Sequence, residues 1–207
     1  MLYKAVAFTT NEFYRRQSER LEASLTKYGI PYQIERLEHP GTWHKAVSMK
    51  PAFIKRMLEE TTLDGVLYLD ADAEVVAHLP MSVFDGVDIG FTNFQRSPEH
   101  LPEMLTGTMF FRKSQEVIDF VSAWIERVPI WAHSQTPEQD ALKQTFVDLK
   151  PTLALMSMHY AWTYIHDDFK ELFPNVKPLI LHYQASREYR EKELRDEKAK
   201  AKSQANG

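Results

Sequence analysis

The chain has 207 residues, of which 43% are hydrophobic, and it carries a formal net charge of −4. This length favours one domain with a single sizeable core, and the weak negative charge gives no general attraction for nucleic acid. The lack of cysteine excludes disulfides, thiolate catalysis and cysteine-ligated zinc. No apolar run resembles a secretory signal or approaches the roughly 20 residues of a membrane span, so we expect a cytoplasmic protein.

The first third of the chain alternates between strand and helix patterns. Strands are predicted over residues 2–9, 32–37 and 65–69, and helices over residues 12–28 and 52–61. Gly29 is a typical helix stop, and Pro51 is suited to the first turn of the second helix. This β-α-β-α-β order predicts an α/β fold with helices on the faces of a parallel sheet.

The rest of the chain is less regular. Strands are predicted over residues 87–93, 106–112, 153–158 and 179–183, and helices over residues 115–127 and from Thr136 onward. After residue 187 the sequence is dominated by charged residues and alanine. We therefore expect one domain over residues 1–187, followed by a solvated tail over residues 188–207 that is helical or disordered.

One stretch, GVLYLDADAEVV at residues 65–76, ends an apolar run in three acids, Asp70, Asp72 and Glu74. If the strand continues through them, these side chains share one face, about 6–7 Å apart. Neighbouring carboxylates repel, which raises one pKa or recruits a cation, and oxygen ligands suit Mg²⁺ or Mn²⁺. The alternative is a polar strand end with solvated acids.

This acidic segment resembles the D-x-D strand of GT-A glycosyltransferases. In that class the motif holds a divalent metal and the diphosphate of a nucleotide-sugar, which here implies contacts from Asp70, Ala71 and Asp72. The resemblance covers about residues 6–187. It implies a single GT-A (Rossmann-like) domain, with a mixed, mostly parallel central sheet flanked by helices.

A late histidine extends the resemblance to the glycogenin-like family eight. Those enzymes complete the metal site with a segment H-[YF]-x-G-x-x-K-P-W, and His182 and the aromatic residue after it match its start. Ala185 replaces the glycine, and the diphosphate-binding lysine is missing, so Arg187, one residue early, could stand in. The resemblance implies Asp70, Asp72 and His182 as ligands of Mn²⁺ or Mg²⁺, whereas the alternative is a structural histidine.

Two further segments follow the same order as in that family. TPEQDAL resembles the D-Q-D segment beside the sugar, which makes Glu138, Gln139 and Asp140 the candidate catalytic residues. The alternative is a helix start in which Thr136 and Gln139 form a capping box. TGTMFF resembles the strand near the donor sugar, so Gly107 is a candidate donor contact, and simple packing is the alternative.

The remaining donor contacts are the least specific. Thr9, Thr10 and Asn11 follow the first strand, where GT-A folds border the nucleotide base. Lys50 precedes a predicted helix at a position where such enzymes often place a basic donor contact. Trp43 could shape the same wall.

The resemblance implies a metal-dependent transferase that moves a sugar from a nucleotide-sugar to a hydroxyl acceptor. The expected donor is a UDP-sugar. That acceptor could be a glycan, a lipid, a protein or a modified DNA base. In an inverting enzyme, Asp140 or Glu138 would act as the base on the acceptor hydroxyl. Gln139 and His182 favour the retaining course, in which no strong base is needed.

Three alternatives have other sequence requirements. A haloacid-dehalogenase-type phosphatase also uses D-x-D with Mg²⁺, but it requires Thr or Val where this chain has Glu74. A sugar-phosphate nucleotidylyltransferase requires a glycine-rich basic loop after the first strand, which is absent here. The third alternative is a catalytically degenerate module that binds a nucleotide-sugar.

Overall fold

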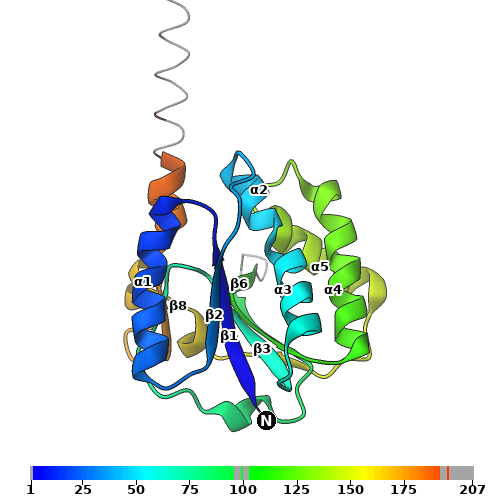
Figure 1. The fold of residues 1–207 in the computed structure, drawn as a ribbon, viewed down its shortest axis with the longest axis horizontal. Helices are drawn as coiled ribbons and strands as arrows, with labels where there is room; N and C mark the ends of the chain where they lie inside the picture. The colour runs from blue at the N-terminus through cyan, green and yellow to red at the C-terminus, as the bar shows by residue number, and fades with distance from the viewer. Residues whose placement is uncertain (1, 96–98, 100–102, 192–194, 196–207) are drawn as a thin grey trace, which may run out of the picture.

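Two sheets and the helices around them form the computed structural model, which describes residues 2–95, 99, 103–191 and 195 (Figure 1). The strands are β1 (Tyr3–Thr9), β2 (Tyr32–Arg36), β3 (Gly65–Leu69), β4 (Ala73–Val75), β5 (Ile89–Phe94), β6 (Glu103–Arg112), β7 (Leu155–Ser157), β8 (Tyr164–Ile165) and β9 (Ile180–His182). The larger sheet has the order β2-β1-β3-β6-β5-β7, and the smaller sheet has the order β4-β9-β8.

The helices lie on both sides of the larger sheet. They are α1 (Glu12–Lys27), α2 (Trp43–Ser48), α3 (Lys50–Glu60), α4 (Gln115–Arg127), α5 (Pro137–Leu149) and α6 (His166–Leu172), with short 3₁₀ turns at Met81–Phe84, Val128–Trp131 and Tyr160–Thr163. Figure 1 shows α1 on one side of the sheet and α3, α4 and α5 on the other. No helix in the described part of the chain is long and apolar enough to cross a membrane.

The larger sheet is mixed but mostly parallel, as predicted. Strand β1 pairs in parallel with β2 and β3, and β5 pairs in parallel with β7. Only β6 runs in the opposite direction among the described strands of this sheet, antiparallel to both β3 and β5. The predicted β-α-β-α-β order of the first third is confirmed, with the short helix α2 as an addition that was not predicted.

Alternate residues of the central strands fill two cores. Val6, Val66 and Tyr68 belong to the core that contains residues of α3, α4 and α5. Ala5 and Leu67, one position away in the same strands, belong to the core that includes residues of α1 and the smaller sheet. Burial on both faces explains why these strands read as continuous apolar runs.

The third strand has its predicted bounds and does not continue through the acids. Strand β3 ends at Leu69, residues 70–72 form a turn, and β4 then enters the smaller sheet. The predicted tail also begins in ordered structure, because a helix runs over residues 185–191. Residues 192–194 and 196–207 of that tail lie outside the described residues.

Candidate active site

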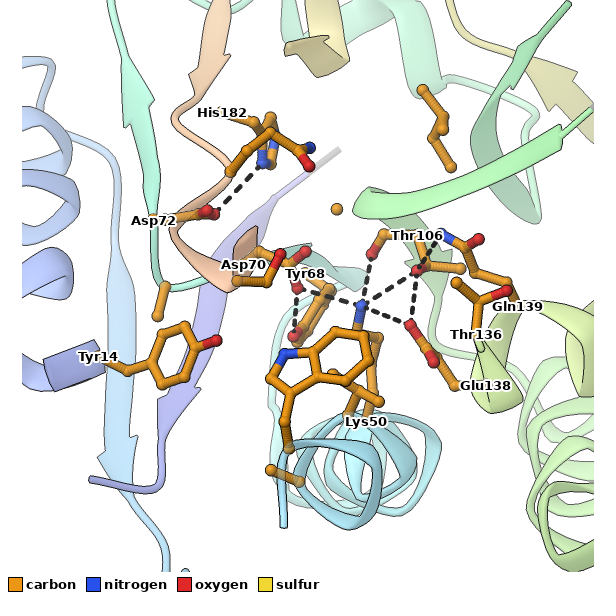
Figure 2. A pocket seen from close by; sticks show the side chains of 18 of the residues that line it. Tyr14, Lys50, Tyr68, Asp70, Asp72, Thr106, Thr136, Glu138, Gln139 and His182 are labelled. Atoms are coloured by element: carbon orange, nitrogen blue, oxygen red, sulfur yellow. Dashed lines mark hydrogen bonds and ion pairs between the residues drawn. The ribbon is translucent and has the colours of Figure 1, made fainter. Parts of the chain in front are cut away.

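A cavity of about 220 Å³ opens at the carboxyl ends of β1 and β3 (Figure 2). Ligands of open α/β sheets bind at this edge because the strand ends and the following loops meet there. Many of the residues singled out from the sequence line the cavity: Thr10, Lys50, Asp70, Ala71, Asp72, Gly107, Glu138, Gln139 and His182.

The turn after β3 brings two of the three acids into the cavity. The Asp70 N–H donates to the Gly107 carbonyl at 2.8 Å, which extends the β3–β6 ladder by one bond. The Ala73 N–H then donates to the Asp70 carbonyl at 3.0 Å and closes the turn. Asp70 and Asp72 line the cavity, whereas the Glu74 carboxylate accepts a hydrogen bond from the Tyr183 hydroxyl at 2.6 Å and is not part of the lining.

The smaller sheet delivers the histidine to these acids. Strand β9 runs antiparallel to β4, and this register places His182 opposite Ala73, next to Asp72. The imidazole Nε2 lies 2.8 Å from the Thr108 hydroxyl, and Nδ1 lies 3.8 Å from Asp72 Oδ1. Asp70, Asp72 and His182 each offer one ligand atom, all within 4.8 Å of one another.

Gly107 leaves the space in which these three groups meet. A Cβ atom at this position would lie 3.0 Å from His182 Cε1, 3.1 Å from His182 Nδ1 and 3.3 Å from Asp70 Oδ2. Any larger residue would therefore push against the imidazole and the carboxylate together. The atoms that this glycine spares belong to two of the candidate ligands, His182 and Asp70.

Asp72 is a buried carboxylate held in its charged form. Burial raises the pKa of its carboxyl, but interactions with His182 and the Ala185 N–H outweigh that effect, so the pKa lies below its usual value. The Ala185 N–H donates to Asp72 Oδ2 at 2.8 Å. The other oxygen, Oδ1, faces His182.

Lys50 joins Asp70 to Glu138 on the opposite wall (Figure 2). Its ammonium lies 3.1 Å from Asp70 Oδ1 and 3.6 Å from Glu138 Oε1, and it donates to the carbonyl and hydroxyl of Thr106. Burial lowers the pKa of Lys50, but the two carboxylates outweigh that effect and raise it above its usual value. The Tyr68 hydroxyl donates to the same Asp70 oxygen at 2.9 Å.

Two polar atoms of the cavity residues are buried without a hydrogen-bond partner: Glu138 Oε2 and the Tyr14 hydroxyl. Glu138 itself is only 4% exposed. A buried polar atom without a partner costs free energy, so such atoms commonly mark the place of a ligand. The cavity thus combines carboxylates, an imidazole and unpaired polar atoms suited to a polar, hydroxyl-bearing ligand.

Comparison with known proteins identifies the family. The sequence matches the nucleotide-diphospho-sugar transferase family over residues 15–195. The chain belongs to this family. The transferase is similar in structure to a glycosyltransferase involved in the glycosylation of the major capsid of PBCV-1, with a TM-score of 0.70 and 14% identity, over 89% of this chain and 93% of that one. This likeness shows the fold, and a search of curated proteins finds no match.

The structure does not bring every predicted contact to the cavity of the transferase. The Thr9 hydroxyl donates to the Glu35 carbonyl at 3.5 Å, and the Asn11 side chain caps α1 at the Tyr14 N–H. Asp140 accepts hydrogen bonds from the hydroxyls of Ser134 and Thr136. None of Thr9, Asn11 and Asp140 lines the cavity.

Arg187 is also directed away from the cavity. Its guanidinium forms a bidentate ion pair with Asp168, at 2.5 and 3.2 Å. The capping-box alternative for the helix start at Thr136 is wrong, because Thr136 makes no side-chain cap and the Gln139 amide donates instead to the Thr106 hydroxyl at 3.4 Å. Gln139 thereby remains in the cavity lining.

Several cavity residues were missed in the sequence. Tyr68 precedes Asp70 by two positions in an apolar strand, and this spacing was a usable signal. Tyr14 is on the first turn of α1, and Arg190 was included in the predicted solvated tail. Neither carries a local pattern that distinguishes it from a surface residue.

The candidate ligand atoms of Asp70, Asp72 and His182 suit a divalent metal. Two carboxylates and one neutral imidazole nitrogen are ligands that Mn²⁺ accepts, and carboxylates also suit Mg²⁺. With a metal bound, a hydrogen bond from the imidazole Nε2–H to Thr108 would leave the Nδ1 lone pair for the ion in place of a proton directed at Asp72, and partners of this kind commonly orient a ligating histidine. Gly107 keeps the space among the ligand atoms open.

Proposed function

We propose that this transferase is a metal-dependent glycosyltransferase that moves a sugar from a nucleoside-diphosphate sugar, a UDP-sugar, to a hydroxyl acceptor. The observation that carries the proposal is the convergence of Asp70, Asp72 and His182 in the cavity, around the space left by Gly107. Family membership supports the transfer of a sugar from a nucleotide donor. The metal, the nucleotide and the stereochemical course are the proposed parts.

The residues of this chain have distinct parts in the reaction. Asp70, Asp72 and His182 would hold a divalent cation, which when bound would supply Lewis-acid stabilisation of the charge on the leaving diphosphate. Lys50 orients Asp70 through their ion pair, and Thr108 orients the His182 ring. Burial around these groups limits water, which strengthens their electrostatic effect on the reacting atoms.

The retaining course remains the proposal. Gln139 lines the cavity, where it can contact the sugar, whereas Asp140 is not in the lining and accepts hydrogen bonds from Ser134 and Thr136. Glu138 is the other carboxylate available as a base, because its Oε2 atom is buried without a partner. An inverting enzyme would have to use Glu138, so the product anomer decides between the two courses.

The alternatives differ in what they bind and release. Membership in a transferase family gives the haloacid-dehalogenase-type phosphatase no support. A degenerate module would bind the nucleotide-sugar without transferring the sugar. The acceptor, whether glycan, lipid, protein or modified DNA base, does not follow from the cavity residues.

Isothermal titration calorimetry of UDP, with and without Mn²⁺, tests the proposal. We expect UDP to bind with Mn²⁺ and to lose most of its affinity when the metal is chelated, because the diphosphate would face uncompensated carboxylates. Incubation with UDP-sugars and an NMR assignment of the product anomer then test transfer and retention. Binding of UDP that is indifferent to Mn²⁺, or no binding at all, would contradict the proposal.

A further inference from the structure

The cavity lining contains both carboxylates and permanent cations. Asp70, Asp72 and Glu138 are the carboxylates of the lining, and Lys50 and Arg190 are its permanent cations. Lys50 is committed to Asp70, Glu138 and Thr106. Among the residues that the structure describes, no carboxylate pairs with Arg190. A cavity suited to an anionic ligand therefore contains one guanidinium that is available to bind it.

Arg190 is held over the cavity by aromatic contacts. Its guanidinium lies 4.6 Å from the centre of the Trp43 ring, which also lines the cavity. The preceding residue, Tyr189, packs against Phe13 and Tyr14 with ring centres 5.5 and 5.4 Å away. Figure 1 shows this segment, in orange, beside the start of α1. Stacking orients the guanidinium plane and leaves its edge N–H groups free to donate.

The same helical segment is anchored to the candidate metal site. The N–H of Ala185, at its first residue, donates to the buried Asp72 carboxylate at 2.8 Å, and Ser186 lines the cavity. Arg187, two residues after Ala185, pairs with Asp168 and does not line the cavity. The two arginines, three residues apart, thus differ in their partners, since Arg187 forms an ion pair with Asp168 and Arg190 lies over Trp43 in the cavity lining.

We propose that Arg190 contacts the phosphates of the nucleoside-diphosphate donor, in the role that the sequence suggested for Arg187. This inference rests on the proposed function and names a further residue of the donor site. An arginine edge matches phosphate oxygens bidentately, and its indole partner reduces the loss of side-chain freedom on binding. The Arg190 charge complements a metal at Asp70, Asp72 and His182, so that the diphosphate lies between two cationic groups.

The test compares two arginines of one helical segment. UDP binding in Mn²⁺ is measured by calorimetry for the wild type, Arg190→Ala, Arg190→Lys and the comparator Arg187→Ala, and uridine binding is measured by NMR titration at millimolar concentration. We expect Arg190→Ala to weaken UDP binding roughly 10- to 100-fold, because charge-assisted hydrogen bonds are lost. Uridine affinity should stay within about twofold, and Arg190→Lys should recover part of the loss by retaining the charge.

Two controls separate this inference from the proposed function. Mn²⁺ binding without nucleotide should be unchanged in Arg190→Ala, and thermal unfolding should show that the variant is folded. Equal losses for uridine and UDP, or a loss in Arg187→Ala but not in Arg190→Ala, would overturn the assignment while leaving the function intact. Failure of the wild type to bind UDP with Mn²⁺ would instead overturn the function, and this inference with it.

Discussion

Two walls of the cavity contain buried carboxylates, but they differ in whether a lysine of the same wall neutralises that charge. On the lysine wall, formed by Lys50, Thr106 and Glu138, the ammonium lies near Glu138 and also reaches Asp70. On the metal wall, formed by Asp72 and His182 with the Gly107 backbone, the carboxylate is met by an imidazole and the Ala185 N–H. Burying a carboxylate without a permanently charged partner costs free energy, so an external cation at the metal wall would be stabilising.

Burial and charge alone therefore do not identify a metal site in this cavity. Glu138 is as buried as His182, yet its Oε1 atom has Lys50 and Thr106 as partners. The lysine wall should therefore matter chiefly for the fold, and the metal wall chiefly for binding and activity. Three substitutions test that division, and the one with the strongest predicted consequence comes first.

The first substitution is Asp72→Asn, which removes a candidate ligand and retains the side-chain shape. We expect sugar transfer to fall at least about 1,000-fold, because stabilisation by a metal is worth several kcal/mol. The fold should persist, since the Asn carbonyl can still accept the Ala185 N–H. Steady-state kinetics with a UDP-sugar measures the effect.

Glu74→Gln is the matched control, because Glu74 comes from the same acidic run but bonds Tyr183 outside the cavity lining. Its transfer rate should stay within about twofold of the wild type, since the Gln carbonyl can still accept the Tyr183 hydrogen bond and the residue lies outside the cavity lining. Equal losses in Asp72→Asn and Glu74→Gln would contradict the division between the two acids.

The second substitution, Lys50→Met, breaks the lysine wall. It leaves the Glu138 carboxylate buried without its cation, which should lower the free energy of unfolding by about 3–5 kcal/mol. Urea unfolding measures this loss. The double variant Lys50→Met with Glu138→Gln should recover part of it, because the uncompensated charge is gone. A wild-type unfolding midpoint in Lys50→Met would show that this wall does not support the fold.

The third substitution, Gly107→Ala, narrows the space between the candidate ligands. Its Cβ would press on His182 and Asp70, so we expect Mn²⁺ affinity to fall roughly 10- to 100-fold, as for other changes that misplace metal ligands. Calorimetric titration with Mn²⁺ alone measures it. The free energy of unfolding should change by less than about 1 kcal/mol. Unchanged Mn²⁺ affinity would remove Gly107 from the metal wall.

The regular elements were predictable because they bury apolar side chains at a fixed period. The apolar run at residues 65–69 matches β3, and the predicted helix at residues 115–127 matches α4. Strands β4 and β8 have only three and two residues, too few to show a period, and they were missed. The smaller sheet that carries His182 depends on pairing between distant segments.

The candidate site was predictable where a local motif marked it. Asp70 and Asp72 were found from their position after an apolar strand, and Gly107 from its place in a later strand. Arg187 and Arg190 could not be told apart, since both lie in a charged helical segment. Their directions follow from packing against Asp168 and Trp43, which lie elsewhere in the chain.

Local sequence patterns were enough to predict the α/β class and the order of the central elements, because strand and helix periodicity are local properties. They also marked the acids that follow β3, because an acidic motif is local too. Tertiary packing set which of those acids face the cavity, which histidine joins them and which arginine lines the cavity over Trp43. Asp72 lies in the turn after β3 whereas Glu74 lies in β4, and the pairing of β4 with β9 brings His182 to Asp72 across more than a hundred residues. Such contacts depend on the registers of distant strands, which no local pattern encodes.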